Sequence, residues 1–104
     1  VMGKGIPVEA TEEFAATLAA MRVVVSDRDG GEIASGPGTA ILGHPLNAVL
    51  WLTRDLDRSG IRLKPRDVLS LGSFTPLLTP NAGTTIKVRY LGLPGDAEVS
   101  VRFK

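Results

Sequence analysis

The stretch SGPGTAILGHPLNAVLWL, residues 35–52, decides how the rest of the chain is interpreted. It carries three glycines and a His-Pro step directly in front of an apolar run. Pro45 fits the first turn of a helix, where a missing backbone N–H costs nothing, and Gly60 is a natural residue to follow the helix end. The stretch therefore predicts the principal helix of the fold, over about 45–59.

The apolar positions of that helix cover most of its circumference. Val49, Leu50, Trp51 and Leu52 are successive and span roughly 300° at about 100° per residue. Because one sheet covers only one side of a helix, we expect one face to pack on the chain's own sheet. The other face should pack on another subunit or on a missing upstream segment. Trp51 and either Leu50 or Leu52 should be mostly buried only when neighbouring chains are counted.

The glycines and the histidine of the same stretch could belong to a nucleotide loop or to a catalytic site. Gly36, Gly38 and Gly43 do not form G-x-G-x-x-G, since residue 41 is Ile. We expect Gly36 and Gly38 to let the chain leave a strand and bend tightly. His44 is the only histidine, which excludes a site of several imidazoles. A helix N-cap is its favoured role, and a catalytic role is the alternative.

The remaining elements follow from capping and alternation. Thr11 before two glutamates predicts a short helix over about 12–20. The opening VMGKGIPV is interpreted as the tail of a strand leaving a larger domain. Alternating or β-branched runs predict further strands at 21–27, 32–35, 68–73, 85–90 and 98–103. In 85–90 the alternation places Ile86, Val88 and Tyr90 on one, inward face and the basic residues on the other. We expect a single domain over 1–104, of class α+β, with a mostly antiparallel or mixed sheet.

Composition narrows the possible partners and location. The 104 residues carry a net charge of +1, which gives no electrostatic reason to expect nucleic acid or an anionic membrane as a partner. The chain has no cysteine, so disulfides and thiolate metal sites are excluded within it. No apolar run approaches the roughly 20 residues of a membrane helix. We therefore expect a soluble, cytoplasmic protein.

The second distinctive stretch is LGSFTPLLTP, residues 71–80. A predicted strand ends in Gly72, and Ser73 and Thr75 follow it with hydroxyl groups and free backbone N–H groups. Such a loop can hold a carboxylate without a basic side chain, although ordinary turn chemistry explains these residue types equally well. No pair of acids has the E-x-E alternation that would aim two carboxylates at a hard cation. The chain by itself therefore predicts no metal site.

Four segments in combination resemble one enzyme family: SGPGTAILGHPLNAVLWL, SGIRLKPRDVLSLGSFT, PNAG and VSVRF. They are similar to the C-terminal part of 2-keto-4-pentenoate hydratases, 2-oxohept-4-ene-1,7-dioate hydratase and 4-oxalocrotonate decarboxylase, in the fumarylacetoacetate hydrolase superfamily. The similarity covers nearly the whole chain. It departs at Arg66-Asp67 and at Gly83-Thr84, where relatives commonly carry Gly-Asp, and these departures weaken assignment to one subfamily.

The resemblance implies a lyase that hydrates or decarboxylates a small 2-oxo-enoic acid in aromatic-compound catabolism. It implies a divalent metal, Mg or Mn, whose carboxylate ligands are expected upstream of this chain, so none is assigned here. The metal would polarise the keto group and favour the enol form. By the same resemblance, Gly72, Ser73, Phe74 and Thr75 would bind substrate. No residue is assigned a catalytic role.

Three hypotheses remain open at this point. The chain is the C-terminal portion of a metal-dependent enzyme, or a stand-alone assembly or binding domain that keeps the fold without the metal site. A third hypothesis is an enzyme completed by a second polypeptide that carries the metal ligands. Each is compatible with a homo-oligomer or with packing on a missing N-terminal segment.

Overall fold

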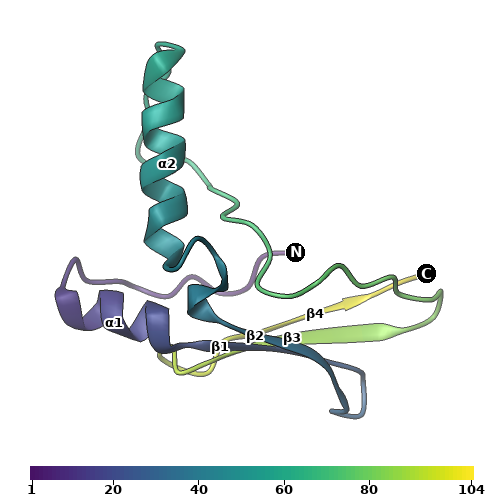
Figure 1. The fold of residues 1–104 in the computed structure, drawn as a ribbon. Helices are drawn as coiled ribbons and strands as arrows, with labels where there is room; N and C mark the ends of the chain where they lie inside the picture. Colours follow the sequence, from purple (N-terminus) through teal and green to yellow (C-terminus); the bar gives the residue numbers. More distant parts are fainter.

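The computed structural model describes all 104 residues and combines two α-helices, a 3-10 turn and one sheet (Figure 1). The sheet has four strands in the order β2-β1-β3-β4, and every neighbouring pair is antiparallel. The predicted α+β class with an antiparallel sheet is confirmed. The strands are β1 (Arg22–Ser26), β2 (Glu32–Pro37), β3 (Thr85–Leu91) and β4 (Glu98–Arg102).

The centre of the sheet is β1, whose valine run is the most buried part of the chain. It forms a hairpin with β2, and the turn between them is held by Asp27. The Asp27 side chain accepts hydrogen bonds from the backbone N–H groups of Asp29, at 2.9 Å, and Gly31, at 2.8 Å. The other edge of β1 pairs with β3, which forms the second hairpin with β4. The 21–27, 32–35, 85–90 and 98–103 strand predictions are confirmed.

The register gives the sheet two different faces. Val25 pairs with Val88 and Val88 with Val99, while Val23 pairs with Tyr90, so these side chains share one side, called here the apolar face. Basic side chains lie on the opposite side, called here the polar face; they include Arg22, Lys87 and Arg89. The apolar face is covered by residues 1–6, 74 and 78–80 of the same chain.

The short helix α1 (Glu12–Ala20) lies at one end of the sheet (Figure 1). Thr11 caps it, since its hydroxyl accepts the backbone N–H of Phe14 at 3.1 Å. Gly38 packs against its last turn so closely that any Cβ would overlap the Leu18 carbonyl oxygen. The expected bend is present, since β2 ends at Pro37 and the 3-10 turn begins at Gly38. Gly36 and Gly38 have no positive φ, so what they contribute is close approach to other backbone. The 3-10 turn η1 (Gly38–Ala40) bends the chain away after β2.

The principal helix α2 (Pro45–Arg58) has the predicted bounds and caps. Pro45 stands in its first turn, and Gly60 follows its end with φ 72°. The backbone N–H of Ile61 returns to the Leu56 carbonyl at 2.9 Å, closing the C-terminus. Neither helix has the length and apolar character needed to cross a membrane.

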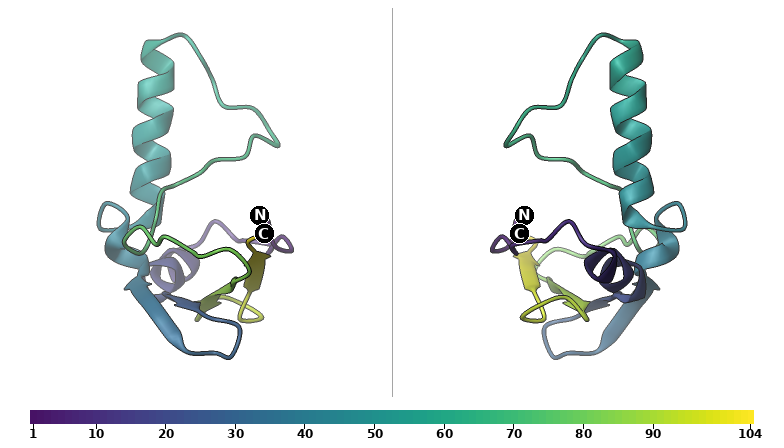
Figure 2. Two further views of the ribbon diagram at one scale, coloured as in Figure 1. Left: turned by 90° about the vertical axis from the view of Figure 1, so that its right-hand side faces the viewer. Right: turned by 90° about the vertical axis from the view of Figure 1, so that its left-hand side faces the viewer.

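The prediction that α2 packs on the chain's own sheet is wrong. Figures 1 and 2 show α2 rising away from one end of the sheet, and its neighbouring elements are α1 and η1. Residues 1–6, 74 and 78–80 already occupy the apolar face, so no place is left there for the helix. Leu50 is 53% exposed and Trp51 60% exposed within this chain. Their burial against another chain or segment stays a prediction.

Two predicted strands do not form. Residues 68–73 carry no regular structure and donate and accept no backbone hydrogen bond, so they pair with no strand of this chain. The predicted strand tail at the opening is also wrong, since residues 1–10 carry no regular structure. The turn before 68–73 is present and is closed by Asp67, whose backbone N–H donates to the Lys64 carbonyl at 3.1 Å.

Candidate functional site

The predicted substrate loop, residues 72–75, lies against the apolar face of the sheet. Gly72 starts it with φ 115°, a conformation that L side chains rarely adopt. Phe74 then crosses the backbone of β2 at Gly36, where any Cβ would overlap the Phe74 carbonyl oxygen. The absence of a side chain at Gly36 therefore allows the loop to seat on the sheet.

An aromatic contact connects the loop to the next strands. The rings of Phe74 and Tyr90 are 6.3 Å apart between centroids and inclined by 86°, an edge-to-face pair. Tyr90 lies on β3, two strands away from the Gly36 contact. The loop thus spans from β2 to β3, and both of its anchors belong to the apolar face.

Polar groups of the loop are arranged around Ser73. Its hydroxyl donates to the Thr75 carbonyl at 2.7 Å and accepts the Thr75 backbone N–H at 3.4 Å. The backbone N–H groups of Ser73 and Phe74 donate to no group of the chain. Two successive N–H groups of this kind can bind the oxygens of a carboxylate without a basic side chain.

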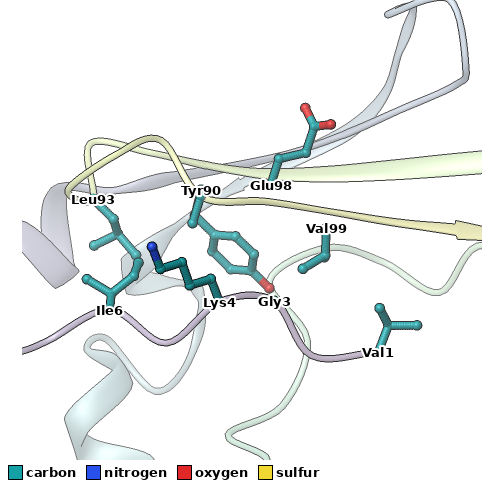
Figure 3. Close-up of a pocket in the computed structure, with 9 residues that line it drawn as sticks. Val1, Gly3, Lys4, Ile6, Tyr90, Leu93, Glu98 and Val99 are labelled. Atoms are coloured by element: carbon teal, nitrogen blue, oxygen red, sulfur yellow. The ribbon is translucent and has the colours of Figure 1, made fainter.

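A cavity of about 340 Å³ opens beside the loop, with Tyr90 as the shared wall (Figure 3). Its remaining walls come from the opening segment of the chain, from the β3–β4 turn and from β4. They are Val1, Gly3, Lys4, Ile6, Leu93, Ala97, Glu98 and Val99. The volume lies at the lower end of the range for small-molecule sites, about 300–1,000 Å³.

Tyr90 and Lys4 were not singled out as site residues from the sequence. The alternation of residues 85–90 placed Tyr90 on an inward face, which is a signal for burial and not for binding. Lys4 stands in a segment without regular structure, and no sequence pattern predicts its neighbours.

His44 caps α2, as the favoured interpretation predicted. Its Nδ1 accepts the backbone N–H of Leu46 at 3.1 Å, and so the ring proton belongs to Nε2. Nε2 donates to the Ala15 carbonyl oxygen of α1 at 2.8 Å. Both ring nitrogens are therefore engaged in joining the two helices.

The acidic side chains of this chain do not assemble into a metal site. No group of three or more His, Asp and Glu side chains lies close enough together to hold an ion.

Comparison with known proteins identifies relatives along most of the chain, although no protein-family model matches it. It is 41% identical over 70 residues to the TodF product hydratase of Pseudomonas putida F1, covering 67% of this chain and 26% of that protein. It is 35% identical over 80 residues to a 4-oxalocrotonate decarboxylase of Pseudomonas putida, covering 77% of this chain and 29% of that protein.

Solved structures give the same result. The 4-oxalocrotonate decarboxylase of Pseudomonas putida G7 superimposes with a TM-score of 0.75 at 33% identity, over 85% of this chain and 32% of that one. One of its structures holds calcium and acetate, and another holds magnesium and adipate. The chain thus spans between a quarter and a third of the length of these relatives.

Proposed function

Since this chain is related in sequence and fold to one portion of the 2-keto-4-pentenoate hydratase and 4-oxalocrotonate decarboxylase family, we propose that it works as part of a metal-dependent lyase. The resemblance read from the sequence is confirmed. The proposed substrate is a small 2-oxo-enoic acid of aromatic-compound catabolism, which the enzyme hydrates or decarboxylates in the cytoplasm.

The observation that carries the proposal is the 72–75 loop. It is fixed on the sheet at Gly36 and Tyr90, and it presents two successive backbone N–H groups without acceptors. The solved decarboxylase structures were determined with acetate and with adipate, both of which are carboxylates. In the proposed enzyme, the N–H groups of Ser73 and Phe74 hold a substrate carboxylate, and the Ser73 hydroxyl, which donates to the Thr75 carbonyl, keeps the loop in this conformation.

The metal is held by residues outside this chain, because the acids within it form no ligand group. A divalent ion such as magnesium or manganese would, when bound, polarise the keto oxygen of the substrate. The contribution of this chain is to bind and orient the acid at the 72–75 loop.

The exposed side of α2 supports assembly with further polypeptide. Leu46, Leu50 and Trp51 together leave a large apolar area in water, and burying a leucine-sized side chain is worth about 1.5–3 kcal/mol. We propose that this side packs on another subunit or on an upstream segment that brings the metal ligands.

The first test uses the isolated chain and magnesium or manganese, followed by thermal unfolding. A ligand that binds the native state raises the unfolding temperature, so the isolated chain should show no metal-dependent rise. A clear rise would contradict the claim that its residues do not hold the ion.

The second test uses the chain purified together with the subunit or upstream segment on which it is proposed to pack. It should consume 2-keto-4-pentenoate or release carbon dioxide from 4-oxalocrotonate, and a chelator should abolish either reaction. Replacement Ser73→Ala should raise the KM, with Ser70→Ala as the matched control on the exposed segment just before the loop.

An assembly that binds magnesium but turns over neither acid would contradict the enzymatic proposal. That result would favour the alternative, a non-catalytic assembly or binding domain. The observation that favours this alternative is that no group of three or more potential metal-ligand side chains lies together within the chain.

A further inference from the structure

The cavity beside the 72–75 loop combines apolar walls with two unused polar groups. Ile6, Leu93 and Val99 supply hydrocarbon surface, while Lys4 and Tyr90 supply an ammonium and a phenol hydroxyl. Neither polar group makes a hydrogen bond or an ion pair with the rest of the chain. Figure 3 shows the Lys4 side chain running alongside Tyr90, with its nitrogen toward Leu93.

Glu98 borders the same cavity, but its carboxylate is turned away from it. The strand alternation places Glu98 on the polar face, directly opposite Arg89 of β3, whereas its neighbour Val99 faces the cavity. Figure 3 shows the Glu98 carboxylate directed away from the Lys4 nitrogen. Lys4 is therefore the charged side chain that sets the electrostatic preference of the cavity, and it favours an anion.

We propose that this cavity binds an organic acid with a short apolar tail, through a carboxylate held by Lys4. An ammonium and a carboxylate form a charge-assisted hydrogen bond. Figure 3 shows the Tyr90 hydroxyl directed toward Gly3, away from the Lys4 nitrogen, so Tyr90 contributes the surface of its ring rather than a second hydrogen bond to this carboxylate. The tail lies against Ile6, Leu93 and Val99. The inference deepens the proposed function and rests on it in one respect, namely the identification of this acid as the enzyme's substrate or product.

The position of Tyr90 makes this cavity part of the same site as the loop. One edge of its ring packs against Phe74, and the residue also lines the cavity. An acid bound at Lys4 would contact Tyr90 and, through it, alter the environment of Phe74. Amide signals of the 72–75 loop should therefore respond to occupancy of the cavity.

The test is a titration of the isotope-labelled chain with hexanoate, followed by amide NMR, with hexan-1-ol as the neutral control of equal length. Hexanoate should shift the amides of Gly3, Lys4 and Val99 in a saturable way, and hexan-1-ol should bind at least tenfold more weakly. Lys4→Gln should weaken hexanoate binding about tenfold, whereas Tyr90→Phe, which removes a hydroxyl directed away from the Lys4 nitrogen, should change it by less than about twofold.

Two controls exclude a general charge effect. Lys87→Gln removes the same charge from the polar face and should leave hexanoate affinity unchanged. Val1 also borders the cavity, so selective acetylation of its α-amino group tests whether that group holds the carboxylate in place of Lys4; hexanoate affinity should stay unchanged.

Equal binding of hexanoate and hexan-1-ol, or equal affinity in Lys4→Gln and the unaltered chain, would overturn the inference. These outcomes leave the proposed function standing, because it depends on the 72–75 loop and on turnover. Conversely, Lys4-dependent binding in an assembly without turnover would support this site and contradict the proposed function.

Discussion

The sheet and the principal helix are two regions of one short chain that differ in how far other segments of the chain bury them. Val23 in β1 is 2% exposed, between Gly36 of β2 and Tyr90 of β3, and both of these neighbours contact Phe74. Trp51 in α2 is 60% exposed, although it is the largest apolar side chain of the protein. Both regions are strongly apolar in sequence, but α2 contacts α1 and η1 and still leaves Leu50 and Trp51 mostly exposed.

The difference shows that local signals and burial are separate properties. The ends of α2 are fixed by His44, Pro45 and Gly60, which act within a few residues and need no distant partner. The sheet depends instead on pairing between residues far apart in the chain. Changes in the two regions should therefore have very different effects on stability.

The largest effect is expected at the junction of the two regions. Gly38→Ala places a Cβ against the Leu18 carbonyl oxygen, a backbone atom that cannot move alone, and should cost about 3 kcal/mol of unfolding free energy. Gly5→Ala is the matched control, because no atom lies within 4 Å of its added Cβ. Urea unfolding measures both. Equal stability of the two variants would show that α1 is not packed on the junction as described.

The next effect compares one side chain from each region. Val25→Ala removes two methyl groups from a site that is 5% exposed and should cost about 2 kcal/mol. Leu50→Ala changes an exposed position and should alter the stability of the isolated chain by less than about 0.5 kcal/mol. Chemical denaturation measures the unfolding free energy of both variants. A loss of more than 1 kcal/mol for Leu50→Ala in a proven monomer would mean that α2 is covered within the chain.

A smaller effect is expected at the cap of α2. His44→Ala removes the acceptor for the Leu46 N–H and the bond to Ala15, and should cost about 1 kcal/mol. His44→Asn keeps a good N-cap but not the contact with α1, so its loss should be intermediate. Far-UV circular dichroism during urea unfolding provides the measurement. Full stability of His44→Ala would refute the role of this residue in joining the helices.

The smallest effect is expected on the polar face. Arg22 contacts Glu32 at 3.0 Å, but both side chains are about half exposed, and such pairs contribute between 0 and about 1 kcal/mol. Glu32→Gln should therefore change the unfolding free energy by less than about 0.5 kcal/mol, with Glu98→Gln as a control of equal charge. A strong dependence of the Glu32→Gln effect on salt would contradict this expectation.

Features governed by neighbouring residues were predictable from the sequence. Thr11, His44 and Gly60 cap their helices as expected, and the alternation of residues 85–90 gave the correct inward face. The segment 68–73 has strand-like residues, yet it forms no strand because pairing requires a second strand beside it. Sequence periodicity carries no information about whether that neighbour exists.

The candidate site was predictable only in part, because residue types are visible in the sequence and contacts between distant segments are not. Residue types indicated that the 72–75 loop could bind a carboxylate. Its contacts with Gly36 and Tyr90 join segments that are distant in the chain, and so does the cavity between Lys4 and Tyr90. The placement of α2 failed as a prediction because chain segments without regular structure occupy the apolar face, and no sequence pattern predicts where such segments lie.

The pairing of β1 with β3 has a kinetic consequence. The two outer pairs are hairpins between neighbouring segments, whereas residues 27–84, including all of α2, separate β1 from β3. Contacts between neighbouring segments form faster than contacts across a long loop, so the hairpins precede the central ladder, and their meeting limits the folding rate. Loop-closure entropy rises by only about 0.6 kcal/mol for each doubling of length. Evolution can therefore lengthen or shorten α2 to suit a partner while the rate of folding changes little.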